Sequence, residues 1–441
     1  MTSTAVVGGG IAGLVAARSA AIRGDDVTLV ESSGGLGGRV SSVEVGGVRV
    51  DVGAESYASR GTQVSQLVAA LGLVEVDPVE GGAWLQLADR AVPLPGMSVL
   101  GIPGSPLATD VRAVIGARAA WRAWADRVIP ELHVGRETDL DRLVRRRMGD
   151  SVLEKLVRPV VDGVYGLDPA DADAEALIPG INGALTATGS LSSAVLSLRG
   201  GAQAGAAVRG IRGGVHLLAD ALVDDLRARG VRLLKRTTVD GVRPDGDDWR
   251  VSGPAFDERF RHVVIATPGD AARDLLEASV GREIVEGWPD GRDSTVVVLV
   301  IDDDRLDDSP RGTGVLVADR VDGAATALTH SSAKWPWLRE ALPRGRHVLR
   351  LSYKDRVAID VRRAVSDASR LSGVDLRPQD VVGHASRSWR QDVSRAYRGV
   401  SGRIDRLRLA VDELDGLSVV GAWVAGTGLA AVVRDAQRPP T

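Results

Sequence analysis

The hydrophobic pattern of the first 31 residues predicts a strand, a helix and a second strand in quick succession. The segment of residues 4–7 is short and its residues are mostly β-branched, which is typical of a buried strand. An alanine-rich stretch then has helical character up to Arg23, and Gly24 ends it, since glycine is common just past a helix. Residues 27–31 predict a second buried strand that ends on a carboxylate.

Farther along the chain, the pattern alternates between helical and strand-rich parts. Helices are expected at residues 64–73, 108–160 and 212–230. Short strands in a Pro/Gly-rich stretch are expected at 84–106, and longer ones at 231–242, 249–253, 261–265 and 294–301. The alternation of strands and helices seen in the first 31 residues therefore returns after the long helical segment 108–160.

A glycine motif lies between the first strand and the first helix. Gly8 allows a tight turn, Gly10 lets the backbone approach a pyrophosphate, and Gly13 lets the helix pack on the strand. Free N–H groups at the start of that helix face phosphates. Glu31, at the end of the second strand, can accept hydrogen bonds from an adenosine ribose. Together these features predict a dinucleotide-binding site.

The segment after Glu31 bears on which dinucleotide is bound. Gly37, Gly38 and Arg39 would place a turn and a guanidinium beside the pyrophosphate, where a fixed cation offsets negative charge. A predicted hairpin over residues 43–56 brings Gly53 to the same region, although an ordinary hairpin with glycine turns is the plain alternative. An NAD dehydrogenase usually continues with a plain βαβ unit, so this insertion favours FAD.

These N-terminal features resemble a known superfamily. Residues 8–13, Glu31, the LGGR sequence at 36–39 and the step from Asp51 to Gly53 look like the FAD-binding amine oxidases, phytoene desaturases and protoporphyrinogen oxidases. In that superfamily the arginine lies by the diphosphate and the hairpin lines the isoalloxazine. The resemblance therefore implies a resident FAD.

Blocks in the middle of the chain narrow the resemblance to bacterial, FAD-dependent, oxygen-using coproporphyrinogen and protoporphyrinogen oxidases. The similar blocks are residues 93–107, 142–179 (with GVYGLD at 163–168), 331–338, 349–353 and 421–433. Two places depart from the family pattern. The proline and histidine of its Pro-x-Tyr and Gly-His steps are absent from residues 394–403, which keep Tyr397, and its Gly-Pro-x-Ser reads Gly-Ala-Glu-Ser at 53–56.

The resemblance implies an α/β fold with a Rossmann-like FAD-binding domain built from separated segments, an inserted α-helical lobe and a mixed α+β substrate domain. We expect the FAD-binding segments at residues 1–75, 203–270 and 401–441. The helical lobe is expected at 76–202 and the substrate domain at 271–400.

Cofactor contacts are expected where turns and helix starts surround the bound dinucleotide. The resemblance places Val239 on the adenine side and Trp389 near the flavin, with a packed core tryptophan as the alternative. No catalytic side chain is assigned, since the flavin carries the chemistry. The expected FAD contacts are Gly8, Gly9, Gly10, Ile11, Ala12, Gly13, Glu31, Ser32, Gly38, Arg39, Gly53, Ala54, Glu55, Ser56, Val239, Ala266, Trp389, Gly421, Gly426, Thr427 and Gly428.

The resemblance also implies the reaction. Coproporphyrinogen III would give a hydride to the flavin in each of three cycles and so become coproporphyrin III, and O₂ would reoxidise the flavin each time with release of hydrogen peroxide. Protoporphyrinogen IX is a second candidate substrate. Propionates need cations, so Arg60, Arg199 and Lys334 are expected in the cavity, with a solvated surface charge as the alternative for each. Tyr165 could line the cavity or serve only to hold its turn.

Composition excludes several other chemistries. The chain has no cysteine, so disulfides, thiolate metal sites and cysteine nucleophiles are excluded and redox activity must come from a cofactor. A formal net charge of −3 gives no polyanion-binding signature, so no nucleic-acid partner is expected. The six histidines lack ligand spacing, so no metal is predicted.

Two further features concern location. The uncharged run 416–433 reads as a strand, a glycine-rich turn and a helix start rather than a transmembrane span, so a cytoplasmic protein is expected. The run 145–147, three arginines, is interpreted as a solvated helix face. A peripheral membrane contact, or transient docking of the next haem-pathway enzyme, is the alternative for that run.

Two other functions stay open at this point. The chain could be an FAD amine oxidase or carotenoid desaturase relative, although only four tyrosines and two phenylalanines are available for the aromatic pair of an amine oxidase. It could also be a non-catalytic flavin- or porphyrin-binding protein, which the absent Gly-His step would fit.

Overall fold

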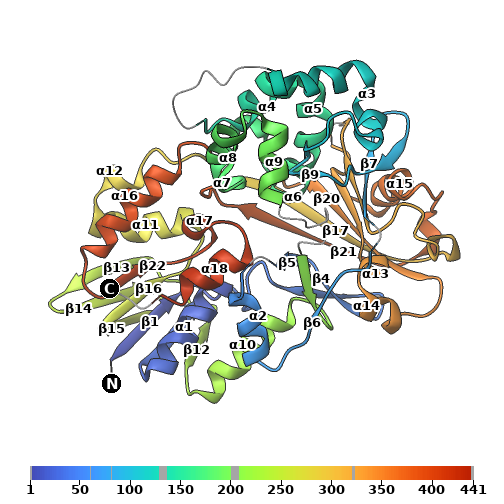
Figure 1. Cartoon of the computed structure of the whole chain (residues 1–441). Helices are drawn as coiled ribbons and strands as arrows, with labels where there is room; N and C mark the ends of the chain where they lie inside the picture. The colour runs from blue at the N-terminus through green and yellow to red at the C-terminus, as the bar shows by residue number, and fades with distance from the viewer. Residues whose placement is uncertain are drawn as a thin grey trace.

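Five parallel strands from widely separated parts of the chain form one sheet of the computed structural model (Figure 1). The structure describes residues 2–59, 61–80, 82–128, 137–199, 208–319 and 323–438. The strand order is β12-β2-β1-β16-β22. Their bounds are Ser3–Val7 (β1), Asp26–Glu31 (β2), Arg232–Lys235 (β12), His262–Ile265 (β16) and Leu417–Val419 (β22).

Both faces of this sheet are covered because its strands are apolar on both sides. Val6 and Val264 pack under one group of helices, whereas Val7 and Ile265 face the opposite layer. The first layer contains α1 (Ile11–Arg23), α2 (Gln63–Ala70), α10 (Leu217–Ala228) and α18 (Leu429–Ala436). The second contains the antiparallel strands β13 (Gly241–Asp245), β14 (Asp248–Gly253) and β15 (Phe256–Phe260), with helices α11 (Gly269–Val280), α12 (Arg282–Val285) and α16 (Ser401–Asp412).

A second, mostly antiparallel sheet of seven strands lies beside the first, on the right in Figure 1. Its order is β21-β17-β20-β19-β18-β7-β8. The bounds are Ala83–Gln86 (β7), Ala91–Pro93 (β8), Arg292–Asp302 (β17), Gly314–Val317 (β18), Ala327–His330 (β19), Arg346–Lys354 (β20) and Val381–Gln391 (β21).

Different elements pack on the two faces of the seven-stranded sheet. Helix α15 (Val361–Ser372) packs on the outer face, against Leu299 and its neighbours. The inner face meets the hairpin of β3 (Ser42–Val45) and β4 (Val48–Asp51), and the short helices α13 (Ser331–Lys334) and α14 (Pro336–Ala341). Val298 and Val300 are buried under this cover.

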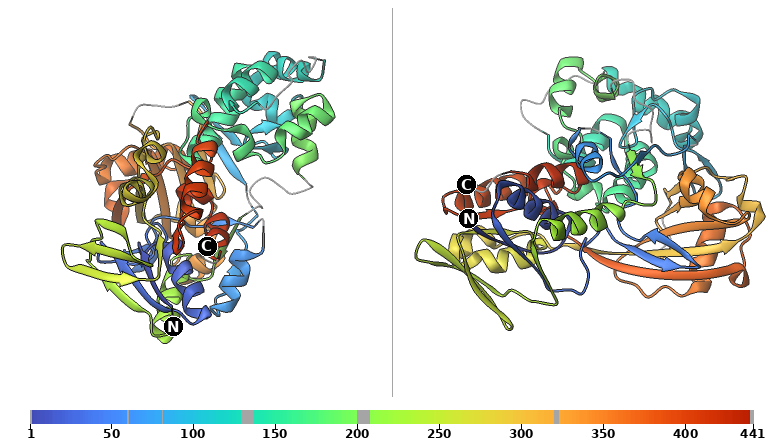
Figure 2. Two further views of the ribbon diagram at one scale, coloured as in Figure 1. Left: turned by 90° about the vertical axis from the view of Figure 1, so that its left-hand side faces the viewer. Right: turned by 90° about the horizontal axis from the view of Figure 1, so that it is seen from below.

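The helices between residues 109 and 199 form a lobe at the top of Figure 1, and Figure 2 shows this lobe projecting from the rest of the molecule. Its larger helices are α3 (Thr109–Trp124), α4 (Leu140–Met148), α6 (Arg158–Tyr165), α8 (Ile181–Thr188) and α9 (Leu191–Arg199). Helix α6 contacts the seven-stranded sheet, because Lys354 Nζ lies 2.9 Å from Asp162 and Gln391 Nε2 donates to the Tyr165 carbonyl.

The prediction of a solvated arginine face is wrong for Arg147. Its side chain is buried, and its Nε donates to Asp126 at 2.5 Å. Asp126 also accepts from Ser192, so this buried carboxylate has several donors around it. Arg145 and Arg146 are exposed, as predicted. A buried charge survives here because it is paired.

The mixed α/β class predicted from the sequence is confirmed by this architecture. The run 416–433 forms β22, the short helix α17 (Ala422–Ala425) and the start of α18, as expected. In the described parts of the chain, no helix is both long enough and apolar enough to cross a bilayer. The exact domain boundaries stay predictions.

Candidate functional site

The turn between β1 and α1 has the geometry that a bound phosphate requires. Gly8 has a φ of +111°, and a Cβ on Gly13 would lie 1.8 Å from the Gly8 carbonyl oxygen. Only glycine therefore lets the helix begin this close to the strand. At Gly10 an added Cβ would meet no atom within 4 Å, so the space before the helix N-terminus is open. Such a terminus favours an anion.

Glu31 lies beside this turn at the end of β2. Its carboxylate accepts the Gly9 N–H at 2.7 Å and the Ser33 N–H at 2.7 Å. A carboxylate has about four acceptor sites, so the two amides leave capacity for hydroxyl groups. The Thr237 N–H donates to the Glu31 carbonyl, which places the bend containing Val239 nearby.

Arg39 is a cation inside a water-accessible space. The residue is exposed to solvent, yet the protein around it lowers the pKa of the guanidinium by desolvation, an effect that the nearby Asp392 opposes. No described residue accepts a hydrogen bond from its side chain or forms an ion pair with it. The charge is therefore available to a ligand.

Gly53 lies directly against the backbone of Arg39. A Cβ on Gly53 would be 1.7 Å from the Arg39 carbonyl oxygen, and the Ala54 N–H donates to that same oxygen at 3.0 Å. The segment 53–56 thus runs alongside the arginine turn, as the resemblance implies for a segment that lines the flavin. Ser56 follows on this segment and is partly exposed.

Glu55 lies in a buried ion cluster that we name the Glu55 cluster: Glu55, Ser331, Lys334 and Arg350. Its carboxylate is 2.9 Å from Lys334 Nζ and 2.7 Å from Arg350 Nη1, and it accepts the Ser331 hydroxyl at 2.7 Å. Burial alone would raise the pKa of Glu55, but Lys334 and Arg350 lower it well below its usual range. The cluster joins the first segment of the chain to the seven-stranded sheet.

The Glu55 cluster changes the interpretation of two sequence predictions. Lys334 was expected to hold a substrate carboxylate, and in the structure it is ion-paired with Glu55, which it shares with Arg350. Arg350, which the sequence analysis did not single out, donates Nη2 to the Gly53 carbonyl at 2.7 Å and so supports the 53–56 segment. Residues on the same face of β20 as Arg350 include Arg346, Ser352 and Lys354, so no sequence signal singled out Arg350.

The remaining expected cofactor residues lie at the carboxyl ends of β16 and β22 or nearby. The Ala266 N–H donates to the Val7 carbonyl, and the hydroxyl of Thr267 is buried without a partner in the described structure. Gly421 begins α17, and Gly426, Thr427 and Gly428 form the turn into α18, with Thr427 and Gly428 exposed. Ile11 and Ala12 are buried in the first turn of α1, and Ser32 and Gly38 are exposed next to Glu31 and Arg39.

The expected flavin contact Trp389 and the expected substrate residues Tyr165 and Arg199 are dispersed. Trp389 is partly buried on β21, and its indole N–H has no partner among the described residues. Tyr165 is the last residue of α6, and its carbonyl accepts from Gln391. Arg199 Nη1 lies 2.6 Å from the Met97 sulfur at the end of α9. Arg60 lies outside the described residues.

These residues fit FAD in the respects that the structure can test. The open space at Gly10 and the available charge of Arg39 suit a pyrophosphate, and the spare acceptor capacity of Glu31 suits a ribose. The Thr267 hydroxyl is buried without a partner among the described residues. It follows Ala266, whose carbonyl oxygen would lie 2.7 Å from a Cβ on Gly8.

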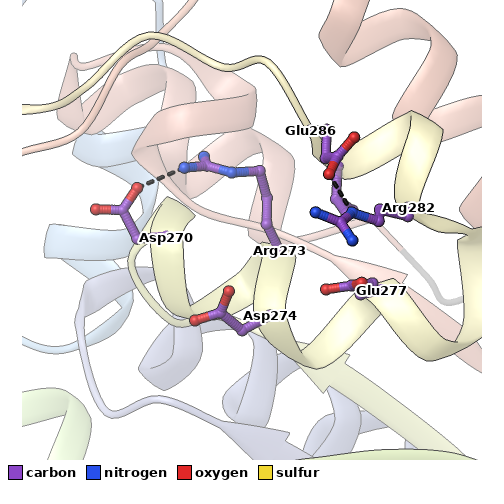
Figure 3. A pocket seen from close by; sticks show the side chains of 7 residues that line it. Asp270, Arg273, Asp274, Glu277, Arg282 and Glu286 are labelled. Atoms are coloured by element: carbon purple, nitrogen blue, oxygen red, sulfur yellow. Dashed lines mark hydrogen bonds and ion pairs between the residues drawn. The ribbon is translucent and has the colours of Figure 1, made fainter.

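A separate pocket of about 510 Å³ lies on α11 and α12 (Figure 3). Its charged side chains pair with one another: Arg273 with Asp270 and Arg282 with Glu286. Arg390 also contacts Asp270 at 3.0 Å. None of the expected FAD residues lines this pocket.

Comparison with known proteins supports the assignment of the fold and the cofactor. The profile of the family described as flavin-containing amine oxidoreductase matches residues 11–438. The coproporphyrinogen III oxidase of Mycobacterium leprae is 30% identical over 459 residues, which cover 99% of this chain and 97% of that protein. The coproporphyrinogen III oxidase of Staphylococcus aureus is 27% identical over 367 residues, 79% of this chain and 77% of that protein.

Solved structures share the fold at lower identity. A crystal structure from Exiguobacterium sp. 255-15, with a provisional designation as a protoporphyrinogen oxidase, superposes with a TM-score of 0.84 at 22% identity and covers 99% of this chain and 97% of that chain. Reduced UDP-galactopyranose mutase superposes with a TM-score of 0.72 at 13% identity, covering 99% and 92%.

Proposed function

Because the chain belongs to the flavin-containing amine oxidoreductase family and, within it, to the bacterial porphyrinogen oxidases, we propose that it oxidises coproporphyrinogen III to coproporphyrin III. O₂ is the proposed acceptor and hydrogen peroxide the proposed second product. Protoporphyrinogen IX is proposed as an additional substrate. The observation that carries the proposal is the similarity to coproporphyrinogen III oxidases over 99% of the chain.

Bound FAD supplies the hydride acceptor, so the protein has to bind, orient and exclude water more than it has to activate a nucleophile. Glu31 would hold the ribose, and the N–H groups at Gly10 together with Arg39 would hold the pyrophosphate. Arg350 fixes the 53–56 segment from the side opposite Arg39, through the Gly53 carbonyl and Glu55. The two contacts of Arg350, with the Gly53 carbonyl and with Glu55, would set the distance between the flavin-facing segment and the seven-stranded sheet.

Charge on the seven-stranded sheet favours this proposal over an amine oxidase. Arg350 and Arg387 lie on its inner face; Arg350 is paired with Glu55, whereas Arg387 has no ion-pair partner among the described residues. Guanidinium groups attract carboxylates and repel protonated amines. A porphyrinogen with propionate groups therefore suits this face better than an alkylammonium substrate does.

The test is an aerobic assay with FAD-loaded protein and each porphyrinogen. Porphyrin fluorescence should appear faster than autoxidation and in proportion to protein, with matching peroxide release. FAD-free protein is the control. No acceleration with either porphyrinogen would overturn the proposal, and peroxide formed from amines alone would favour an amine oxidase. Flavin that binds at full occupancy without turnover would favour the non-catalytic alternative.

A further inference from the structure

The inner face of the seven-stranded sheet is closed at two places and partly open between them. At one end, the hairpin of β3 and β4 covers it, since a Cβ on Gly46 would lie 2.8 Å from Val300. At the other end, α6 covers it through the Lys354–Asp162 ion pair. The middle of this face therefore lies between the hairpin and the helical lobe.

Strand register identifies the side chains on this middle part. Val298 lies opposite Arg350 on one neighbouring strand and opposite Ala385 on the other, so all three share the inner face. Two residues farther along, Val296 lies opposite Ser352 and Arg387. Val298 is buried, whereas these next residues are partly or fully accessible. We name Val296, Thr329, Arg350, Ser352, Arg387 and Trp389 the inner floor.

Arg387 differs from the other cations near the inner floor. Arg350 and Lys334 are both bound to Glu55, and Lys354 is bound to Asp162. Arg387 is exposed, and no described carboxylate lies within ion-pair distance of it. It contacts Trp389, whose ring centroid lies 5.0 Å from the guanidinium carbon.

This contact prepares Arg387 for a ligand. A guanidinium that lies over an indole face keeps its N–H groups at its edge, where they can donate in pairs to a carboxylate. The ring also limits the side-chain freedom that binding would otherwise have to remove. Figure 1 shows that β21, which carries both residues, extends from the seven-stranded sheet into the centre of the molecule.

We propose that Arg387 binds a propionate carboxylate of the porphyrinogen, with Trp389 holding its guanidinium in place. This inference rests on the proposed function for the identity of the ligand. It assigns the role expected of Lys334, which lies on α13, to a residue on β21. Arg387 is thereby a substrate-binding residue, and it does not need to contact FAD.

The test compares steady-state kinetics of the wild type, Arg387→Gln and Arg387→Lys. Loss of one charge-assisted carboxylate contact should raise KM for coproporphyrinogen III by about 10-fold to 100-fold. The value of kcat and the FAD content should stay near those of the wild type. Arg387→Lys should recover part of the loss, because it keeps the charge without the planar fork. An unchanged KM in Arg387→Gln would overturn the inference.

Arg362→Gln is the matched control. Arg362 is also exposed, but it lies on α15, which covers the opposite face of the same sheet. It should leave KM unchanged. If Arg362→Gln raised KM as much as Arg387→Gln does, general surface charge would explain the effect and the inference would fail.

A binding measurement separates failure of this inference from failure of the proposed function. Coproporphyrin III is titrated into FAD-loaded wild type, Arg387→Gln and Arg362→Gln, and its fluorescence gives Kd. Wild type that binds the porphyrin but oxidises neither porphyrinogen would overturn the proposed function alone. Equal affinity of wild type and Arg387→Gln would overturn the role of Arg387, whether or not turnover occurs.

Discussion

Replacing Glu55 by glutamine should destabilise the whole protein, because it leaves two partly buried cations without their anion. The Glu55 side chain is 7% exposed, with Lys334 and Arg350 at 2.9 and 2.7 Å. Glutamine keeps the shape and can still accept a hydrogen bond, so the main change is electrostatic. Glu55 also ties the 53–56 segment to the seven-stranded sheet through Arg350.

The size of the effect follows from the burial of the pair. Removing one partner of a buried ion pair costs about 3–5 kcal/mol, and the retained hydrogen bonds favour the lower end, about 3 kcal/mol. Unfolding entropy of about 2.1 cal/mol/K per residue over 441 residues converts this to a Tm decrease of about 3 °C. Glu286→Gln is the matched control, since its ion pair with Arg282 is exposed. It should cost less than about 0.5 kcal/mol.

The same substitution should also change the pH dependence of stability. The folded-state pKa of Glu55 is lowered from an unfolded value of about 4.3, so its contribution is complete well above that value and is lost as the pH falls below it. The stability difference between wild type and Glu55→Gln should be constant from about pH 6 to 8. Below about pH 4.3 it should shrink by at most about 1.36 kcal/mol per pH unit.

Urea unfolding followed by tryptophan fluorescence, with calorimetry for Tm, measures both quantities. Adding Lys334→Met to Glu55→Gln should restore part of the lost stability, since it removes one uncompensated buried cation. The reasoning is refuted if Glu55→Gln matches Glu286→Gln in stability. It is also refuted if the difference from wild type stays constant down to the acid limit.

Three further predictions concern the dinucleotide turn and a buried histidine pair. Gly10→Ala should leave Tm unchanged but weaken FAD retention, because its Cβ meets only open space, whereas Gly13→Ala should lower Tm through a clash with Gly8. Calorimetry and flavin absorbance of the purified variants test this prediction, and equal behaviour of the two variants would contradict it. Arg39→Gln should weaken FAD binding by about 10-fold to 100-fold, as measured by quenching of flavin fluorescence, and an unchanged Kd would remove Arg39 from the site. The side chain of His330 is buried, its Nε2 lies 3.1 Å from His347 Nδ1, and burial lowers the pKa of His330 to about 3. The folded state should therefore lose up to about 1.36 kcal/mol of stability per pH unit as the pH falls from about 6.5 towards 3. His330→Gln should reduce this slope in urea titrations, and an unchanged slope would contradict a neutral His330.

Local sequence signals were sufficient for the dinucleotide turn. Glycine spacing, a β-branched strand and a terminal acid all act within about 30 residues, and the structure has β1, α1 and β2 where the pattern predicts them. The returning strands β16 and β22 were also recognisable, because buried parallel strands are continuous apolar runs. The FAD family assignment follows from the same local blocks.

Charge partners could not be predicted, because they join residues far apart in sequence. Lys334 and Glu55 are separated by 279 positions, so the sequence identified both residues as functional but not as a pair. Arg147 illustrates the same limit, since nothing in an arginine run indicates which member meets a buried aspartate. Arg387 became visible only through the register of β17 and β21.

The most direct test of the account is anaerobic mixing of FAD-loaded protein with coproporphyrinogen III, with flavin absorption and porphyrin fluorescence recorded together. Three two-electron steps separate a porphyrinogen from a porphyrin and one FAD accepts two electrons. Oxidised-flavin absorption should therefore be lost before O₂ is admitted, and O₂ should then restore that absorption with release of peroxide while porphyrin fluorescence rises over repeated cycles. Flavin that stays oxidised at saturating porphyrinogen would contradict the claim that this chain is a porphyrinogen oxidase.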